Sequence, residues 1–273
     1  MKPLDDYRKY LEEAEKSDLT IEKYLRDAEA FLRWLGSRPI EKEKILAYKA
    51  YLTERYAIAS VNSMLSAVNH YLTFLGRQDC RVRVIRRQRQ LFCSTERELT
   101  RQEYQRLVNA AKGSPKLQLL LQTICATGIR VSEHRFITVE AARSGVAEVR
   151  CKGKLRTVLL PKKLCRALLN YAKKTGIRQG SLFVTRNGTP LDRSYIWAEM
   201  KKLCKAANVL AEKVFPHNLR HLFARTYYAQ EKDIVRLADL LGHASINTTR
   251  IYTVESGREH RRQIERMQLC CIT

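Results

Sequence analysis

The sequence has no run of about 18 consecutive apolar residues, the length that a membrane-spanning helix requires. Its opening residues are charged and lack the apolar core of a signal peptide: MKPLDDYRKYLEEAEK. The eight cysteines are scattered and form no Cys-x-x-Cys pair, which argues against a zinc site and against a disulfide framework. We therefore expect a cytoplasmic protein with reduced thiols, no bound metal and no membrane partner.

Acidic residues are few beside the basic ones. The 273 residues include 28 Asp and Glu against 51 Lys and Arg, which gives a formal net charge of +23. Hydrophobic residues make up 45% of the composition, an ordinary value that argues against wholesale disorder. An unbalanced charge of this size favours a polyanion as the partner, with a merely basic globular protein as the alternative.

The amino-terminal part carries apolar residues three and four positions apart, the spacing of amphipathic helices. Helices are predicted at 4–16, 24–35, 41–55 and 58–75. Gly36 and Gly76 follow two of them as natural stops. Short helices of this kind bury their apolar stripes only against one another, so we expect a helical bundle over residues 1–76.

A basic segment follows at residues 77–96. Between residues 77 and 91 it contains six arginines and a single acid, Asp79. Such a run is commonly a solvated linker, but in a chain of +23 it is also suited to lie along a phosphate backbone while joining two domains. We expect DNA contacts from Arg81, Arg83, Arg86, Arg87 and Arg89.

A second domain is predicted from residue 97 to residue 273. Thr100 and Glu103 have the spacing of a capping box at the start of a helix. Two β-type runs at 146–151 and 155–160 flank a Lys-Gly-Lys turn, which predicts a hairpin. A short strand is expected at 181–185, and helices are expected to dominate the remainder. The pattern indicates a mixed α/β domain.

Three of the six histidines lie in two short contexts, HNLRH and LGHAS. His217, Arg220 and His221 are separated by three and four positions, so on one helix they share a face. Two imidazoles and a guanidinium on one face suit a phosphate better than an apolar core. His243, in the second context, is the third of these histidines.

Five segments of the second domain resemble, in order, the conserved boxes of the tyrosine recombinases, or phage-type integrases. They are TGIRVSE at 127–133, KGKLRTVLLP at 152–161, HNLRHLFA at 217–224, LGHASINTT at 241–249 and IYT at 251–253. The amino-terminal segment LTIEKYLRDAEAFLRWL is similar to the first box of the family's core-binding domain. The resemblance implies a mainly α fold with a small β-sheet. A SAM-like four-helix core-binding bundle would form, with a mixed α/β catalytic domain, a C-shaped clamp on DNA.

The same resemblance implies an active site of two arginines, a lysine, two histidines and a nucleophilic tyrosine: Arg130, Lys152, His217, Arg220, His243 and Tyr252. Glu133 matches an accessory acid, and His221 is expected to act as a structural neighbour of the reacting groups. Lys154 shares the hairpin turn with Lys152 and is the alternative general acid. The tail at about 257–273 is expected to dock into a neighbouring protomer.

These residue types fit attack on a phosphodiester. Forked, permanently charged arginines hold nonbridging oxygens as negative charge gathers on them. A tyrosine, whose reference pKa is about 10, needs a proton acceptor, and a lysine can protonate the departing 5′ oxygen. The expected product is a 3′-phosphotyrosine bond, which a 5′ hydroxyl of a partner duplex reverses without any metal or other cofactor.

We therefore expect site-specific DNA recombination that integrates or excises a phage or mobile element through a Holliday junction. The expected partners are double-stranded DNA with inverted-repeat core sites and further copies of the chain, as a dimer on a site and a tetramer in the synapse. An accessory protein or a second recombinase is a further potential partner. The alternatives are Xer-type dimer resolution, type IB topoisomerase activity and a DNA-binding relative without catalysis.

Overall fold

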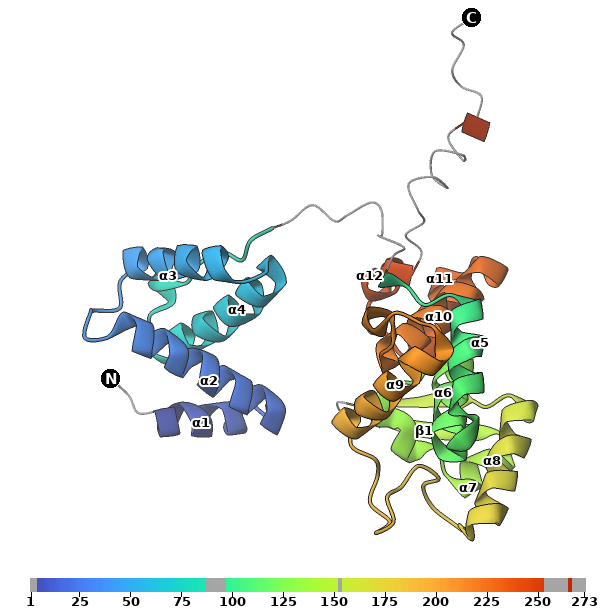
Figure 1. Cartoon of the computed structure of the whole chain (residues 1–273). Coiled ribbons are helices and arrows are strands. Elements are labelled where there is room, and N and C mark those ends of the chain that lie inside the picture. Colours follow the sequence, from blue (N-terminus) through green and yellow to red (C-terminus); the bar gives the residue numbers. More distant parts are fainter. Residues whose placement is uncertain (1–3, 87–96, 152–153, 253–264, 267–273) are drawn as a thin grey trace, which may run out of the picture. The chain divides into compact units, whose positions relative to one another are not determined.

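The computed structural model describes residues 4–86, 97–151, 154–252 and 265–266 (Figure 1). The chain divides into two compact units, Met1–Arg89 and Gln90–Thr273. Both are mainly helical, and a two-stranded sheet lies in the second, so the predicted fold class is confirmed. Among the described helices, none has both the length and the apolar character needed to cross a bilayer.

The first unit is a bundle of four helices. They are α1 (Leu4–Glu13), α2 (Asp18–Leu35), α3 (Lys42–Arg55) and α4 (Ile58–Phe74). Helix α4 packs against the other three, and α2 also contacts α1 and α3. Each helix buries one face, and the buried face of α4 includes Val61, Leu65, Val68 and Leu72 at helical spacing. The apolar residues of the predicted amphipathic pattern therefore form the core of this unit.

The chain after α4 stays on the bundle. A short 3₁₀ turn, η1 (Gln78–Cys80), is followed by an extended segment at residues 81–86, which we call the strap. Asn69 of α4 donates its amide to the carbonyl of Val82 (2.8 Å) and accepts from the N–H of Val82 (2.9 Å). Asn62 binds the backbone of Ile85 in the same two ways, at 2.9 and 2.8 Å. The side chains of Asn62 and Asn69 thus make the backbone hydrogen bonds that a neighbouring β-strand would make with the strap.

Most side chains of the strap are exposed, and Ile85 is partly buried. Val82 is buried, whereas Arg81, Arg83 and Arg86 are exposed. The segment predicted to begin the linker at residue 77 therefore packs, as far as residue 86, on the first unit. Arg87 and Arg89 lie outside the described residues.

The second unit contains the remaining helices and the sheet. Its α-helices are α5 (Arg101–Ala110), α6 (Pro115–Thr127), α7 (Val139–Ser144), α8 (Lys162–Thr175), α9 (Arg193–Ala207), α10 (Pro216–Glu231), α11 (Ile234–Leu241) and α12 (Ile246–Thr249). Among the described residues, 3₁₀ turns that accompany them include η3 (Ala111–Gly113), η4 (Val131–Phe136), η5 (Ala211–Lys213) and η6 (Arg250–Tyr252). Helix α6 is at the centre of the core and packs against α5, α8, α9 and α10. The predicted capping box of Thr100 and Glu103 starts α5.

The sheet is an antiparallel hairpin of β1 (Val146–Cys151) and β2 (Lys154–Leu159). Val149 pairs with Arg156, and both belong to the face turned toward the core, where Val149 and Val158 are buried. The hairpin was predicted from the sequence, but its turn, residues 152–153, lies outside the described residues. The strand expected at 181–185 is absent from the described residues; only single bridges join Thr138 to Ser181 and Val184 to Pro190.

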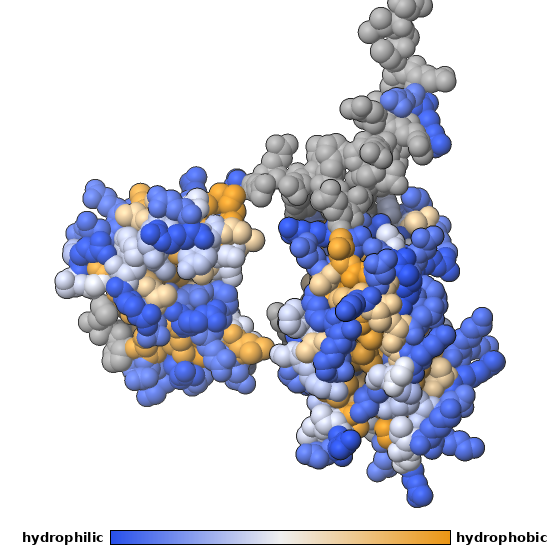
Figure 2. Space-filling model, viewed as in Figure 1, coloured by the Kyte–Doolittle hydropathy of each residue, from blue (hydrophilic) through white to orange (hydrophobic). Residues whose placement is uncertain are grey.

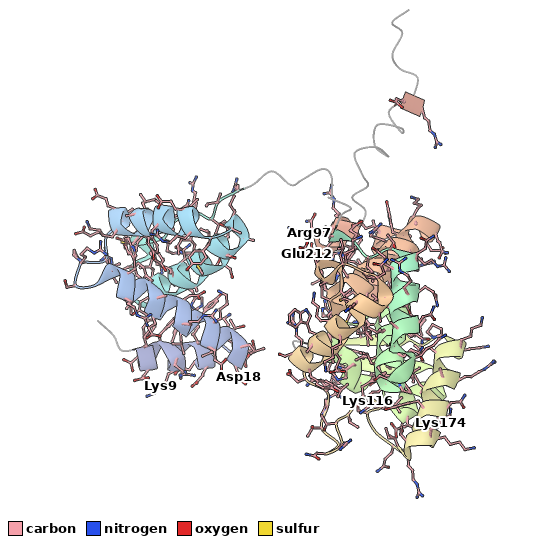
Figure 3. All side chains as sticks on the ribbon, viewed as in Figure 1. Lys9, Asp18, Arg97, Lys116, Lys174 and Glu212 are labelled. Carbon is pink, nitrogen blue, oxygen red and sulfur yellow. The ribbon has the colours of Figure 1, made fainter. Side chains whose placement is uncertain are left out.

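Both units present a mainly hydrophilic surface, with small groups of apolar residues between the charged ones (Figure 2). Long charged side chains extend from the backbone of each unit, for example Lys9 on α1 and Lys174 on α8 (Figure 3). In the sequence, residues 1–76 contain as many acidic as basic residues, so the excess of basic residues comes from residues 77–89 and from the second unit.

Candidate active site

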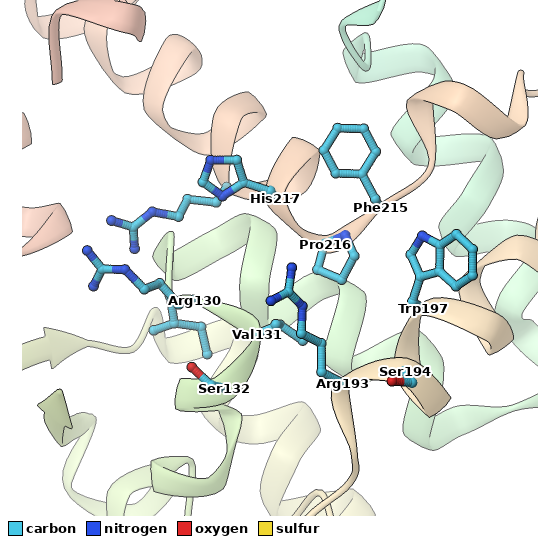
Figure 4. Close-up of a pocket in the computed structure, with 11 residues that line it drawn as sticks. Arg130, Val131, Ser132, Arg193, Ser194, Trp197, Phe215, Pro216 and His217 are labelled. Atoms are coloured by element: carbon cyan, nitrogen blue, oxygen red, sulfur yellow. The ribbon is translucent and has the colours of Figure 1, made fainter. Parts of the chain in front are cut away.

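A cavity of about 680 Å³ opens in the second unit where three segments meet. These are the start of η4, the first turn of α9 and the first turn of α10. Figure 4 shows that Arg130, Arg193 and His217 each come from a different one of these segments and line one shared space, with Trp197 on its other side. Converging cationic and imidazole groups make the cavity suited to an anion.

Helix α10 places the HNLRH residues as the sequence predicted. Pro216 occupies the first helical position, where its missing N–H costs nothing. The rings of His217 and His221 lie 4.5 Å apart, edge to face, on one side of the helix. His217 is exposed, whereas Arg220 has only 1% of its surface exposed. The shared face thus runs from an open imidazole to a fully buried guanidinium.

Arg220 is held by acceptors from two other elements. It donates to the carbonyl oxygens of Gly128 (2.5 Å) and Leu241 (2.9 Å) and to Nε2 of His243 (2.9 Å). Gly128 ends α6 with φ of +65°, and a Cβ there would lie 2.4 Å from the ring of Phe223. Glycine is therefore required by both conformation and space, and it exposes a carbonyl to the buried arginine.

Arg130 is oriented by Glu133, which is 1% exposed. One carboxylate oxygen accepts from the backbone N–H of Arg130 (2.7 Å), and the other accepts from its Nη1 (3.0 Å). The same carboxylate also accepts from Nη2 of Arg156 (2.5 Å). The accessory acid predicted from TGIRVSE is thus a buried carboxylate shared by two arginines.

His243 and Tyr252 both lie next to Arg220. Because a guanidinium only donates, Nε2 of His243 accepts from Arg220, and its Nδ1–H donates to Oγ1 of Thr249 (2.8 Å). Tyr252, in η6, is 4% exposed. Its ring stacks on His243 at 6.1 Å and meets the ring of His221 edge to face at 4.8 Å. The predicted nucleophile is therefore fixed between two imidazoles.

The histidines of the site resist protonation. Burial, followed by the charges of Arg220 and Arg130, lowers the pKa of His243 to about 4. Burial and the neighbouring His217 lower the pKa of His221 to about 4. The pKa of His217 is also lowered, first by the surrounding protein and then by Arg220 and Arg130. All three rings are therefore neutral near pH 7.

The guanidinium of Arg220 remains charged at neutral pH. Burial and the positive charge of Arg130 lower its pKa to about 10, while Tyr252 opposes this through its charge and a side-chain hydrogen bond. The arrangement supplies a fixed positive charge where a reacting phosphate and a tyrosine oxygen would meet.

Five of the six predicted catalytic residues lie in this site. Lys152 lies outside the described residues. Arg81, Arg83 and Arg86 belong to the first unit, and the tail at 257–273 lies outside the described residues apart from 265–266. Within the described part of the chain, no three His, Cys, Asp or Glu side chains gather as potential metal ligands.

Sequence reasoning missed two arginines of the second unit. Arg193 lines the cavity in the first turn of α9, where the helix dipole disfavours a cation. Its only sequence signal was its position directly after Asp192, the residue that caps this helix. Arg156 contacts Glu133 and was part of the KGKLRTVLLP segment without being singled out.

Two models of protein families match the chain. The model described as Phage integrase family matches residues 97–258, and the one described as Phage integrase, N-terminal SAM-like domain matches residues 4–79. Tyrosine recombinase XerA of Pyrococcus furiosus is 29% identical over 274 residues, covering 97% of this chain and 94% of that protein. Tyrosine recombinase XerD of Halalkalibacterium halodurans is 30% identical over 266 residues, covering 87% of each.

Solved structures share the fold. A lambda integrase dimer bound to a COC′ core site has a TM-score of 0.73 and 21% identity, covering 91% of this chain and 93% of that one. A lambda integrase tetramer bound to a Holliday junction has a TM-score of 0.72 and 20% identity, covering 91% of this chain and 75% of that one. At such identities these likenesses concern the fold alone. The integrase model, however, matches more than half of the chain, so this protein belongs to the phage integrase family and is a tyrosine recombinase.

Proposed function

We propose that this chain recombines DNA at specific sites by cutting one strand with Tyr252 and joining it to a partner duplex. The observation that carries the proposal is the position of Tyr252, buried between two neutral imidazoles and next to the buried cation of Arg220. A packing tyrosine needs no such surroundings. A nucleophile whose proton must leave does need them.

The reaction transfers a phosphoryl group of the DNA strand from the 5′ oxygen to Oη of Tyr252. Oη of Tyr252 attacks the phosphorus, and its proton passes to His217. The bond to the 5′ oxygen breaks, and Lys152 supplies the proton that this oxygen takes up. Arg130 and Arg220 hold the nonbridging oxygens as charge builds on them. The product is a 3′-phosphotyrosine link, and attack by a 5′ hydroxyl of a second duplex reverses it.

We further propose that the two units close around the duplex as a clamp. Arg81, Arg83 and Arg86 of the strap are exposed and held by an ordered backbone. They would bind phosphates, together with Arg87 and Arg89, and supply affinity without reading sequence. Such binding weakens steeply with added salt.

Assembly into dimers and tetramers is proposed by analogy with the lambda integrase structures on a core site and on a Holliday junction. The tail at 257–273 would dock into the neighbouring protomer. The mass of the complex on a duplex with two inverted half-sites, measured by sedimentation, tests this. A complex that holds a single protomer at saturation would exclude it.

For the biological role we propose integration or excision of a mobile element. The second candidate is Xer-type dimer resolution, favoured by the names of the relatives that match along most of the chain. Plasmids with two sites in direct repeat, compared with sites on two separate plasmids, distinguish them. Recombination restricted to direct repeats on one molecule favours resolution, and efficient joining of separate molecules favours integration.

The chemistry is tested by trapping the covalent intermediate. A preferred duplex is first selected from a randomised pool by binding, and a nick is then placed near its centre so that the short cut fragment diffuses away. The protein is incubated with this duplex in EDTA. We expect a complex that survives SDS with the wild-type chain and is absent with Tyr252→Phe.

Tyr228→Phe is the matched control, because Tyr228 belongs to α10 and packs on the same small apolar cluster as Tyr252. It should form the adduct as the wild type does. Binding without an adduct in the wild type, or an adduct that persists in Tyr252→Phe, would overturn the proposed chemistry.

A further inference from the structure

Arg156 occupies a position in β2 where an apolar residue would be expected. It pairs with Val149 and lies on the same face of the hairpin as the buried Val158. Only 13% of its side chain is exposed. A cation in such a place is costly unless its donors are satisfied and its charge is paired. The partners of Arg156 therefore indicate what it does.

Arg156 joins two elements that carry predicted catalytic residues. Its Nη2 donates to the Glu133 carboxylate at 2.5 Å, and its Nη1 donates to the carbonyl of Leu240 at 2.7 Å. Glu133 in turn holds both the backbone N–H and the guanidinium of Arg130. Leu240 lies at the end of α11, three residues before His243.

The end of α11 is held by two guanidinium groups. Arg156 binds the carbonyl of Leu240, and Arg220 binds the carbonyl of Leu241. These are carbonyls of the last turn, which lack partners within a helix, and a cation also suits the negative end of the helix dipole. The chain then turns at Gly242 directly into His243.

The space beside Gly242 is shaped for Arg156. Gly242 has φ of +64°, and a Cβ there would lie 2.3 Å from Cδ of Arg156 and 3.0 Å from its Nε. The glycine in LGHAS thus allows both the left-handed turn and the close passage of the arginine stem. The contact ties the KGKLRTVLLP segment to the LGHAS segment across the core.

We propose that Arg156 is a positioning residue of the recombinase site: through Glu133 it sets the orientation of Arg130, and through Leu240 it fixes the turn that presents His243. It does not touch the substrate. This inference rests on the proposed function, since the reaction it supports is strand cleavage by Tyr252.

The first measurement compares single-turnover adduct formation on the nicked duplex with the dissociation constant for the same duplex. Arg156→Gln should form adduct about 10- to 100-fold more slowly, the range seen when a group that orients a functional side chain is removed. The dissociation constant should change less than about twofold, because the duplex keeps its own contacts. Weakened binding with an unchanged rate would overturn the inference.

The second measurement is a double-mutant cycle with Glu133→Gln. If Arg156 acts through Glu133, the double variant should be no more than about threefold slower than the slower single variant, because the two changes break one unit. If the two rate losses multiply, Arg156 and Glu133 act independently and the inference fails. Thermal melting of each variant shows that the rates refer to folded protein.

Arg106→Gln is the matched control. Arg106 also caps a helix, donating to the carbonyls of Ala207 (2.8 Å) and Asn208 (3.0 Å) after α9, but it contacts no residue of the site. Its adduct rate should equal that of the wild type. If Arg156→Gln does not fold, Arg156→Lys takes its place. This variant keeps the positive charge but cannot donate to both Glu133 and the carbonyl of Leu240. An adduct rate equal to that of the wild type in Arg156→Lys would refute the proposal.

Failure of this inference is distinct from failure of the proposed function. A wild-type chain that forms no adduct on a duplex it binds contradicts the chemistry assigned to Tyr252. A wild-type chain that does form the adduct, with Arg156→Gln equally fast, supports that chemistry and removes Arg156 from it.

Discussion

The two units use buried polar side chains in different ways. Among the described residues, eight polar or charged side chains are buried, and only Asp27 lies in the first unit. The other seven lie in the second unit: Thr123, Thr127, Glu133, His134, Asn218, Arg220 and Thr249. A bundle that serves as a support buries apolar stripes, whereas a unit that holds charges in place must bury the groups that hold them.

The partners of these groups make the difference clearer. In the first unit, the polar anchors Asn62 and Asn69 bind backbone and keep the strap on α4. In the second unit, Arg220 and Glu133 bind residues that face the cavity or the candidate nucleophile. A substitution in the first unit should therefore change stability, and one in the second should change chemistry first.

Replacement of Arg220 should give the largest effect. Arg220→Lys cannot satisfy Gly128, Leu241 and His243 together, and it loses the forked donor that a phosphate would use. We expect adduct formation to fall by roughly 100- to 1000-fold. Stability should fall by about 1–3 kcal/mol, because a buried acceptor is left without a partner. The adduct rate and urea unfolding measure the two effects.

Arg225→Lys, on the same helix, is the control for Arg220. Arg225 pairs with Glu98 at a partly exposed position, and Arg225→Lys keeps the positive charge that acts on His221. Its rate should match that of the wild type. If Arg220→Lys and Arg225→Lys lower the adduct rate equally, α10 needs arginines only for its packing. The second unit would then respond to substitution as the first unit does, through stability.

An intermediate effect is expected in the first unit. Asn69→Ala removes both hydrogen bonds to Val82 and should destabilise this unit by about 2 kcal/mol. The sequence offers a direct readout, because its two tryptophans, Trp34 and Trp197, lie in different units. In single-tryptophan variants, Asn69→Ala should lower the urea midpoint reported by Trp34 and leave that of Trp197 unchanged.

Ser63→Ala, at an exposed position of α4, is the control. It should change the free energy of unfolding of neither unit by more than about 0.5 kcal/mol. If the midpoints reported by Trp34 and Trp197 fall together in Asn69→Ala, the two units unfold as one. The distinction between a supporting and a reacting unit would then not extend to stability.

The sequence predicted what depends on local spacing. Helical periodicity located the four helices of the first unit, and local patterns also gave the hairpin and the capping box of the second. The ordered boxes led to Arg130, His217, Arg220, His243 and Tyr252, which the structure brings together. These signals come from residues close in the chain or from a resemblance of whole segments.

Features that depend on distant contacts were missed. Arg156 meets Glu133 across 23 positions, and no local pattern shows that a charged residue in a strand faces inward. The strap looked like a linker because the Asn62 and Asn69 bonds that hold it span 23 and 13 positions. The burial of Arg220 was equally hidden, since HNLRH alone indicates a face and not its depth.

A further difference between the units is expected in their pH dependence. In the second unit the pKa values of His221 and His243 are lowered to about 4, below the 6.5 of an unfolded histidine. Well above pH 6.5 these rings are neutral in both the folded and the unfolded chain, so they make no pH-dependent contribution to stability there. As pH falls from 6.5 to about 4, the unfolded chain binds protons that the folded chain refuses, and the free energy of unfolding decreases, by on the order of 1 kcal/mol per ring at pH 5.

The first unit has one such ring in its described part, His70, whose pKa is lowered by burial and by Lys16 and Arg81. The urea midpoint reported by Trp197 should therefore fall more than that reported by Trp34 between pH 7 and pH 5. His221→Phe preserves a ring against Tyr252 while removing one titrating group, so it should reduce the shift at Trp197 alone. An unchanged shift in this variant would mean that His221 is protonated as readily in the folded chain as in the unfolded one, and that Tyr252 rests against a charged ring.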